Sequence, residues 1–488
     1  LTMASASSFP SSGTVIISNE LITYTGVSGN TLTGLTRGAN GTTAASHSSG
    51  ATVKDASGYA GWNTAVSGDV VTAPGLWSLD NFGNKLVATI TGGESFEWNS
   101  NPTTANNTRA TIISGAPTAS EFSLVSTPDR HLIFFGTETT IGTKSTQDPM
   151  FIRFSSQEDI NTYTPSATNT AGTQRLSDGS KIVGAIRGRD AIYVWTDTAL
   201  FIMRFVGPPF TFSFQQVGTN CGLIGKNAAV EVDGTAYWMS ENGFFRYTGK
   251  LESLPCLVED HVYDDINTTP KQHINVGLNN LFGEIMWFYP NSGSGTVNRM
   301  VAYNYLDSTP QRPVWTVGTL ARTAWQDSAV FGKPHATEYD ADSTTTVDVN
   351  HVYGCTDGVS TYFEHETGLN QVKEGAITAI TASIESGDFD IGQQGLAGDG
   401  EFMMKIRRVI PDFLSQTGDA RVTLNLRDFP NDTQASSTLG PFTVTSGTQK
   451  IDTRARARSI SLKIDNTGAS QFWKVGTFRI DYQPDGRR

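Results

Sequence analysis

The chain has 488 residues, of which 49 are glycine and 17% are charged, and its formal net charge is −12 at pH 7. This length exceeds one small domain, and the abundance of glycine with few charged residues is typical of an all-β protein with many turns. The acidic balance argues against a protein that wraps tightly around nucleic acid, because phosphate binding needs clustered Lys and Arg.

Residues 1–55 are predicted to form a small β module with a turn at Gly29–Asn30. Three β-branched runs indicate its strands: Thr14–Ile17, Glu20–Thr25 and Thr31–Leu35. The polar, glycine-rich stretch 37–50 indicates a loop. His47 in this loop has two interpretations, a metal or acid/base role and a solvated loop histidine, and we favour the second.

Residues 56–370 repeat one unit, a hairpin of apolar or aromatic strands joined by turns rich in Asp, Asn and Gly. The expected pairs are Leu86–Ile90 with Ser95–Trp98, His131–Phe135 with Phe151–Phe154, Ala191–Trp195 with Leu200–Phe205, Thr235–Met239 with Phe244–Tyr247, Glu284–Tyr289 with Arg299–Asn304, and His351–Cys355 with Ser360–Phe363. Each pair ends a segment of roughly 45–65 residues, close to the blade period of β-propellers. We therefore predict a β-propeller-like platform of about six hairpin blades, with a long sandwich or a stack of β domains as the alternative.

Tryptophans mark these strands at positions Trp98, Trp195, Trp238, Trp287 and Trp315. Such residues can form a stacking surface for sugars or bases, or they can fill the core between blades. We favour the core interpretation.

The segment 254–272 is the only stretch for which we expect a helix of note. Its apolar stripe at helical spacing consists of Leu257, Val258, His261, Val262 and Ile266. Its acidic residues are Glu259, Asp260, Asp264 and Asp265. Together with His261 they suit either a carboxylate–histidine metal site or a solvated acidic face, and the solvated face is favoured.

Residues 371–488 alternate apolar and polar side chains, which predicts a C-terminal β-sandwich. Its expected strands are Ala376–Ile384, Phe402–Ile410, Arg421–Leu426, Ser459–Ile464 and Trp473–Tyr482. The stretch 427–450 is expected to be a long crossing loop or a hairpin. Arg454, Arg456 and Arg458 alternate on one face of a strand, where they either meet an acidic partner or phosphate or, as we favour, form a solvated face.

Motifs of the common enzyme classes are absent from the sequence: it contains no GxSxG, HExxH, P-loop or Rossmann glycine pattern. Ser78–Gly83 is faintly similar to the Asp-box of sialidase propellers, a pattern that arises easily by chance in hairpins. The cysteines Cys221, Cys256 and Cys355 are far apart, which favours isolated thiols over a zinc site or a disulfide framework. From these motifs we assign no catalytic, cofactor-binding or metal-binding residue and no cofactor.

No membrane span is expected in this sequence, and its first residues show no features of a secretory leader. No apolar run approaches the roughly 20 residues that a membrane-spanning helix needs. The start, LTMASASSFPSSG, lacks the basic and apolar regions of a secretory signal peptide.

The central stretch Asp178–Phe201 (DGSKIVGAIRGRDAIYVWTDTALF) resembles a recurrent block of the tail hub proteins of short-tailed bacteriophages, also called tail nozzle or packaged-DNA stabilisation proteins. The following block, Val217–Gly225 and then Ala236–Ser240, also resembles the corresponding part of these tail hub proteins. The order of the last strands, Arg454–Lys463 and then Phe478–Tyr482, is similar too. Residues 26–42 resemble a small module found in diverse phage structural proteins.

The resemblance implies a structural virion protein without catalytic residues, which forms a homohexameric ring below the portal and its adaptor, the head-to-tail connector. The ring would close the DNA channel, guide genome ejection, and contact tail fibre, spike or needle proteins. Phage DNA would pass through the lumen without sequence-specific binding, and the short tail would be assembled in the host cytoplasm. An acidic lumen would repel DNA phosphates and let the duplex slide. Two alternatives stay open: a tail-associated carbohydrate-binding or glycan-cleaving propeller, and a trimeric baseplate or adhesin module.

Overall fold

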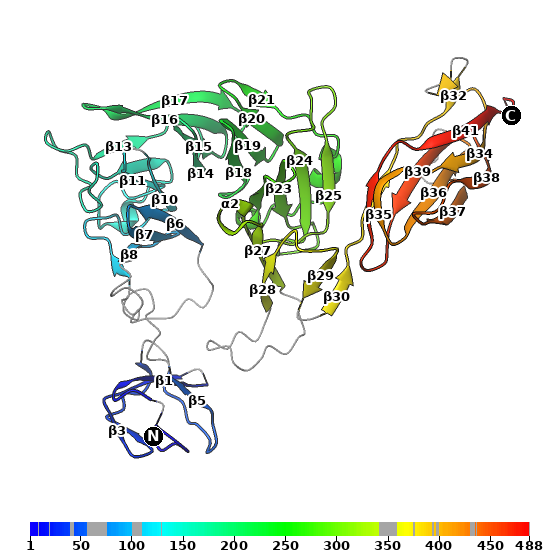
Figure 1. The fold of residues 1–488 in the computed structure, drawn as a ribbon. Helices are drawn as coiled ribbons and strands as arrows, with labels where there is room; N and C mark the ends of the chain where they lie inside the picture. Colours follow the sequence, from blue (N-terminus) through cyan, green and yellow to red (C-terminus); the bar gives the residue numbers. More distant parts are fainter. Residues whose placement is uncertain are drawn as a thin grey trace. The chain divides into compact units, whose positions relative to one another are not determined.

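The computed structural model describes residues 1–7, 9–18, 20–39, 43–55, 76–99, 110–127, 129–340, 359–373, 376–392, 395–396, 400–429, 435 and 437–487. The regular secondary structure of the described chain is almost entirely antiparallel β-sheet, so the predicted fold class is confirmed (Figure 1). It comprises a small N-terminal β module, a β-propeller-like platform and a C-terminal β-sandwich. The chain divides into two compact units, Leu1–His365 and Glu366–Arg488.

The N-terminal module contains a three-stranded sheet and a short hairpin. The sheet has the order β2-β1-β5, formed by β1 (Gly13–Ile17), β2 (Glu20–Tyr24) and β5 (Val53–Asp55). The hairpin consists of β3 (Gly26–Ser28) and β4 (Thr31–Thr33). The module has its own apolar core around Val15, Ile17, Ile22, Tyr24 and Leu32.

Between residues 77 and 364 the described chain forms six successive antiparallel sheets, which we call blades 1 to 6. Blade 1 contains β6 (Trp77–Phe82), β7 (Lys85–Ile90), β8 (Ser95–Asn99) and β9 (Thr111–Ile112). Blade 2 contains β10 (Phe122–Val125), β11 (Leu132–Phe135), β12 (Phe151–Phe154) and β13 (Gly172–Arg175). Blade 3 contains β14 (Ile182–Arg187), β15 (Ile192–Thr196), β16 (Ala199–Gly207) and β17 (Thr211–Thr219).

The later blades follow the same order. Blade 4 contains β18 (Ala229–Val232), β19 (Thr235–Ser240), β20 (Gly243–Tyr247) and β21 (Leu251–Ser253). Blade 5 contains β22 (Asn275–Asn279), β23 (Glu284–Tyr289), β24 (Arg299–Asn304) and β25 (Trp315–Gly318). Blade 6 contains β26 (Ala324–Gln326), β27 (His335–Asp340) and β28 (Val359–Glu364).

The first strand of each blade packs against the first strand of the next, from β6 through β10, β14, β18 and β22 to β26. In Figure 1 the labels β10, β14 and β18 lie toward the middle of the platform, and β13, β17 and β21 lie toward its rim. The first strands are therefore the inner strands. Residues just before them lie where successive blades converge.

Five of the six predicted hairpins are confirmed by the strand register. They are the pairs β7–β8, β11–β12, β15–β16, β19–β20 and β23–β24. The strand expected at residues 351–355 lies outside the described residues, and the described partner of β28 is β27. The predicted hairpins are thus the second and third strands of their blades, whereas the inner and outer strands were not identified from the sequence.

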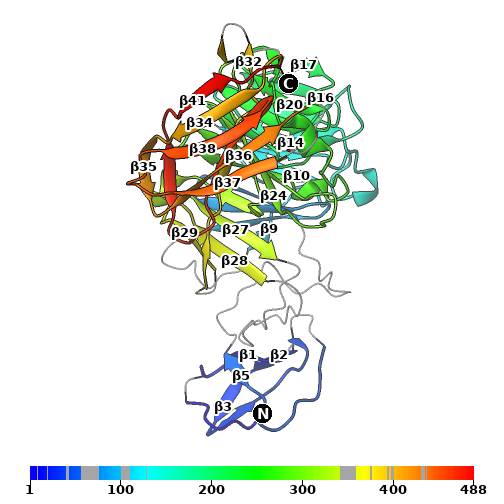
Figure 2. The same ribbon diagram turned by 90° about the vertical axis from the view of Figure 1, so that its right-hand side faces the viewer.

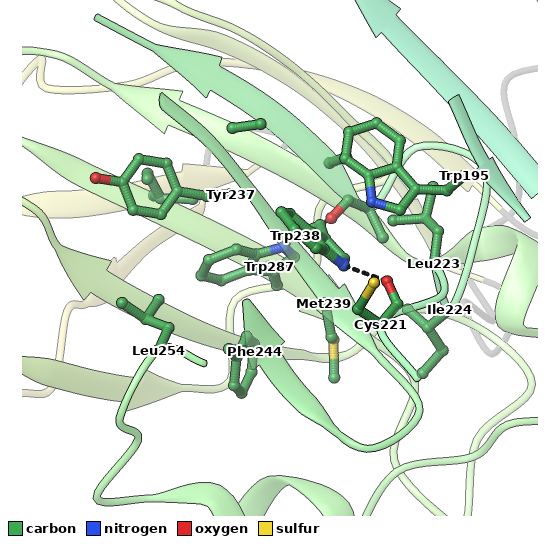
Figure 3. Packing of buried hydrophobic residues seen from close by; sticks show 14 of the residues in the cluster. Trp195, Cys221, Leu223, Ile224, Tyr237, Trp238, Met239, Phe244, Leu254 and Trp287 are labelled. Carbon is green, nitrogen blue, oxygen red and sulfur yellow. Dashed lines mark hydrogen bonds between the residues drawn. The ribbon is translucent and has the colours of Figure 1, made fainter. Parts of the chain in front are cut away.

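The core of blades 3 to 5 contains three tryptophans with no exposed surface, Trp195, Trp238 and Trp287 (Figure 3). The ring centroids of Trp195 and Trp238 are 5.3 Å apart. Nε1 of Trp238 donates to the carbonyl oxygen of Cys221 at 2.8 Å, and Nε1 of Trp287 donates to that of Ala228 at 2.9 Å. The core interpretation is confirmed for these three residues. Trp315 packs at the edge of the same cluster, and Trp98 is half-buried.

The helix expected over 254–272 is much shorter than predicted. The structure contains one α-helical turn, α1 (Glu259–Tyr263), and a 3₁₀ turn at Lys271–His273. Val262 is buried, but Leu257 is 76% exposed, so the predicted apolar stripe is wrong at that position. Prolines at 255 and 270 flank the segment, and each restricts the backbone before it to extended conformations.

The C-terminal unit is built around two facing sheets. One has the order β31-β39-β36-β37, from β31 (Ser383–Glu385), β39 (Ser459–Asp465), β36 (Ala420–Arg427) and β37 (Ser437–Val444). The other has the order β38-β34-β41, from β38 (Ile451–Ala457), β34 (Met404–Ile410) and β41 (Arg479–Pro484). Figure 2 shows these strands in orange and red. The smaller pairs are β29 (Asn370–Lys373) with β30 (Ala376–Ala379), β32 (Ile391–Gly392) with β33 (Gly395–Leu396), and β35 (Phe413–Thr417) with β40 (Phe472–Val475).

Alternation along the strands explains the sandwich core. Side chains of β36 alternate between buried and half-buried along its whole length, so every second residue enters the core. Two predictions need correction. Residues 473–482 form parts of two strands, β40 and β41, in different sheets, and 376–384 divides between β30 and β31. The hairpin alternative for 427–450 is confirmed, because β37 pairs with β36.

Candidate functional site

A pocket of about 430 Å³ opens where the inner strands of blades 1 to 5 begin. Five of the residues that line it come one to four positions before β6, β10, β14, β18 and β22; they are Leu76, Glu121, Lys181, Lys226 and Lys271. These five residues therefore occupy corresponding places in successive blades. The remaining wall is partly apolar, with Phe122, Ile182 and Ile224 among its residues.

The side chain of Lys226 reaches from the connection between blades 3 and 4 to the inner strand of blade 1. Its Nζ donates to Oγ of Ser78 at 2.6 Å and lies 3.5 Å from the carbonyl oxygen of Trp77. It also lies 5.6 Å from the ring centroid of Phe122. Burial lowers the pKa of Lys226 to about 8. Among the described residues, no carboxylate lies within ion-pair distance of this ammonium group.

The other charged residues of the pocket differ in their pairing. Lys271 Nζ contacts Oε1 of Glu241 at 2.5 Å, so its charge is already balanced. Lys181 is exposed and makes no ion pair with the described part of the chain. Glu121 is half-buried, and its Oε1 is 3.4 Å from Nε2 of Gln147. The pocket thus presents two ammonium groups without a carboxylate partner, opposed by one carboxylate.

Blades 1 to 3 are tied together beside this pocket by Asp80 on β6. Its two carboxylate oxygens lie 2.8 and 2.7 Å from Nη1 of Arg187 at the end of β14. One of them also accepts from the backbone N–H of Val125 on β10 at 2.8 Å. In Ser78–Gly83, the stretch with a faint similarity to the Asp-box, the aspartate therefore lies in a strand and joins three blades.

A second polar group in blade 2 has the connectivity of a hydrolase triad. His131 Nδ1 lies 2.7 Å from Oδ2 of Asp129, and its Nε2 lies 3.1 Å from Oγ1 of Thr170. Burial raises the pKa of Asp129, but the hydrogen bonds from His131 and Ser126 outweigh it, and the pKa lies below its usual value.

The imidazole of His131 has no exposed surface and is surrounded by Phe154, Phe205 and Phe212. The Thr170 hydroxyl oxygen also accepts from the backbone N–H of Gln157 at 2.7 Å. In this arrangement the imidazole is out of reach of a substrate, and the group holds loop 156–170 against the end of the β16–β17 hairpin that is next to its turn.

His47 does not lie in solvent as we predicted. Its Nε2 is 2.7 Å from Oε2 of Glu20, a carboxylate with no exposed side-chain surface. Arg37 pairs with the same carboxylate at 2.5 Å, and the backbone N–H groups of Gly38 and Ala45 donate to it. The loop therefore closes over a buried charge, and hydrogen bonds from Arg37, from the backbone of Ala45 and Gly38 and with His47 hold the pKa of Glu20 far below its usual value.

The acidic residues around α1 are not gathered into one site. Asp265 contacts Ser292 at 3.1 Å and Arg299 at 3.5 Å, both in blade 5. Throughout the described residues, no group of three or more His, Cys, Asp or Glu side chains is arranged to hold a metal ion. Glu259, Asp260, Asp264 and His261 thus supply no candidate centre.

The three alternating arginines of the sandwich have different environments. Arg456 pairs with Asp485 at 2.6 Å. Arg458 donates to the carbonyl oxygen of Gly400 at 2.6 Å and to that of Asp428 at 3.1 Å. Arg454 is exposed. Arg454 and Arg456 are both exposed, as the favoured solvated face requires, whereas Arg458 is half-buried and held by carbonyl oxygens of the same unit.

Cys221 is buried and Cys256 is half-buried, and both are free thiols. Burial raises the pKa of Cys221 to about 11 and that of Cys256 to about 12, which keeps both protonated and unreactive near neutral pH. Cys355 lies outside the described residues. No helix in the described part of the chain is long and apolar enough to cross a membrane.

The pocket residues were not identified from the sequence, although a signal for them exists. Lys181, Lys226 and Lys271 recur at intervals of 45 residues, which falls within the blade period. Comparison of the segments just before each inner strand would have brought them together.

Comparisons with known proteins give no family. No protein-family model and no curated protein matches the chain. Among solved structures, the chain is similar to BamB from Moraxella catarrhalis, with 10% identity, a TM-score of 0.30, and coverage of 73% of this chain and 93% of that one. It is also similar to a putative 6-phosphogluconolactonase from Bacteroides fragilis NCTC 9343, with 8% identity, a TM-score of 0.35, and coverage of 68% and 88%.

A third similar structure is the dihydro-heme d1 dehydrogenase NirN in complex with DHE, with 10% identity and a TM-score of 0.33. That match covers 67% of this chain and 57% of the NirN chain. At these identities and TM-scores, the matches carry no argument about activity, ligands or partners.

Proposed function

We propose that the chain is a structural subunit of a short phage tail, which assembles into a homohexameric nozzle ring that closes the DNA channel and guides genome ejection. The observation that carries the proposal is the central block, residues 178–250, which resembles the tail hub family. In this chain the block forms nearly all of blades 3 and 4, from β14 to β20, around Trp195 and Trp238. The resemblance therefore covers two adjacent blades that share one core with blade 5.

Exposed apolar residues on two separate blades support self-assembly. The tip of the β16–β17 hairpin in blade 3 exposes Phe205, Val206 and Phe210, and Phe210 is 78% exposed. Blade 5 exposes a second group, Leu281, Phe282 and Leu306. Large exposed apolar side chains that lie together are typical of protein interfaces.

The charges around these two groups are complementary. Arg204 is exposed beside the hairpin tip, and Asp307 is exposed next to Leu306. A surface that binds a different surface of an identical copy generates a ring when the rotation closes. Contact of the hairpin tip of one copy with blade 5 of the next would be such a heterologous interface.

A sugar-binding platform receives less support from the tryptophans, because Trp195, Trp238 and Trp287 are buried. Contacts with the connector and with fibre, spike or needle proteins, and an acidic lumen, remain predictions of the nozzle proposal.

Electron microscopy of the purified full chain, with mass photometry, tests the proposal. We expect a six-fold ring with an axial channel, and the same ring at the distal end of the tail in the virion. A monomer or a trimer at all protein concentrations would contradict the proposal. A ring whose lumen is strongly basic would contradict the acidic-lumen prediction alone.

A further inference from the structure

The charge of the axial pocket is only partly balanced among the described residues, where Glu121 is the one carboxylate of the pocket wall. Lys181 and Lys226 carry ammonium groups without an ion pair among the described residues, and Lys226 spans the space between blades on its way to Ser78. Removing a charged group from water is costly unless an opposite charge or strong hydrogen bonds compensate. Ser78 and Trp77 supply neutral oxygens only, so an anion in the pocket would complete the environment of Lys226.

We propose that the pocket binds a small dianion, a phosphate monoester or a dicarboxylate, with its charged end between Lys181 and Lys226. Glu121 offsets part of the positive charge of the pocket from a distance. Neither ammonium group forms an ion pair with it, so each of them can contact one negative charge of a dianion. Lysine is a regular binder of phosphate as a point charge. This proposal is independent of the nozzle function.

The rest of the wall restricts the body of the ligand. Phe122, Ile182 and Ile224 offer apolar contact beside the two ammonium groups. Glu121 would repel an anionic group placed beside it, so both negative charges of the ligand belong at Lys181 and Lys226, and a hydroxyl or amine donor of the ligand fits beside Glu121. The pocket volume of about 430 Å³ lies within the usual range for sites of small organic ligands.

Isothermal titration calorimetry on the full chain tests the proposal with sodium phosphate and sodium succinate as probes. Sodium acetate and sodium chloride at equal ionic strength are the reference anions. Lys181→Gln and Lys226→Gln each remove one ammonium group, and Lys250→Gln, an exposed lysine outside the pocket, removes the same charge elsewhere. Lys181 is exposed, so its variant keeps the fold even if Lys226→Gln disturbs it.

We expect a dianion to bind the parent chain and Lys250→Gln equally, and to bind each pocket variant at least about tenfold more weakly. Preference for phosphate over succinate would assign a phosphate monoester, and the reverse preference a dicarboxylate. Phosphate also raises the melting temperature of folded proteins that have no binding site for it. An increase in melting temperature by phosphate that is equal in the parent chain and in all variants would therefore count against binding in the pocket. Absence of dianion binding, or equal affinity in Lys181→Gln and Lys250→Gln, would overturn the proposal, whatever ring the chain forms.

Discussion

Substitution of His365 by glutamine is expected to remove part of the acid sensitivity of the platform. His365 follows β28, and its Nε2 accepts a hydrogen bond from Nε of Arg322 at 3.0 Å. The ring centroid lies 4.6 Å from that of Trp325. Burial, together with the nearby charge of Arg322, lowers the pKa of His365 to about 4. The imidazole is therefore neutral in the folded protein at neutral pH.

The magnitude follows from the difference between the folded and unfolded pKa values. An unfolded histidine titrates near 6.5, so between pH 6.5 and 4 the unfolded chain binds a proton that the folded chain does not. Stability is therefore lost as the pH falls through this window. A separation of about 2.5 units corresponds to about 3 kcal/mol in the free energy of unfolding. Glutamine keeps an acceptor for Arg322 but does not titrate.

The measurement compares urea unfolding of parent and His365→Gln from pH 7 to pH 4, followed by tryptophan fluorescence. Groups that titrate in both proteins cancel in the difference between their free energies of unfolding. Between pH 7 and pH 4 this difference should change by about 3 kcal/mol in favour of the variant. His261→Gln, an exposed histidine on α1, should show no such change. Equal pH dependence of parent and His365→Gln, or an NMR titration of His365 with a midpoint near 6.5, would refute the reasoning.

Three further substitutions test the core and the assembly. Trp238→Phe removes a buried indole and its hydrogen bond, and we expect the free energy of unfolding in urea to fall by about 2–3 kcal/mol. A decrease below about 0.5 kcal/mol would contradict the packing in Figure 3. Gly222→Ala would place a Cβ 2.1 Å from a backbone carbonyl oxygen, so we expect the free energy of unfolding to fall by about 3 kcal/mol or more, or the protein to be insoluble. In the control Gly368→Ala the new Cβ meets no atom within 4 Å, so the free energy of unfolding should not change. Phe210→Ser should weaken self-association by about tenfold or more in analytical ultracentrifugation, whereas Leu414→Ser, an equally exposed apolar site in the sandwich, should not; unchanged assembly of Phe210→Ser would exclude the hairpin tip as an interface.

The parts of the fold that the sequence predicted are the strands buried on both faces. Residues of β15 and β19 are buried almost without exception, which produces the continuous apolar runs from which the hairpins were identified. The outer strands β13 and β21 have four and three residues, none of them fully buried, so their composition resembles that of loops. Their place in the sheets is set by pairing with a neighbour, which a single run of residues does not reveal.

The candidate site was harder to predict because its residues are brought together only by the blade arrangement. Lys226 has no unusual neighbours in sequence, and its contact with Ser78 joins positions almost 150 residues apart. His47 was misassigned for the same reason, since the buried Glu20 that holds it belongs to a strand far from the loop. Polar contacts at long sequence separation leave no local pattern, whereas apolar periodicity does.

The pocket wall takes one residue from the same place in each of five blades, and this has a consequence for how its specificity can change. Each contributing residue precedes a strand whose packing depends on other side chains. Positions 121, 181 and 271 are therefore exchangeable one at a time, so charge can be added, removed or inverted around the axis while the sheets stay intact. Position 226 is more constrained, because Lys226 also bonds Ser78 of blade 1. Related chains with the same platform would present different combinations of residues at these positions, and the axis of the propeller would act as an adjustable ring of side chains on a constant scaffold.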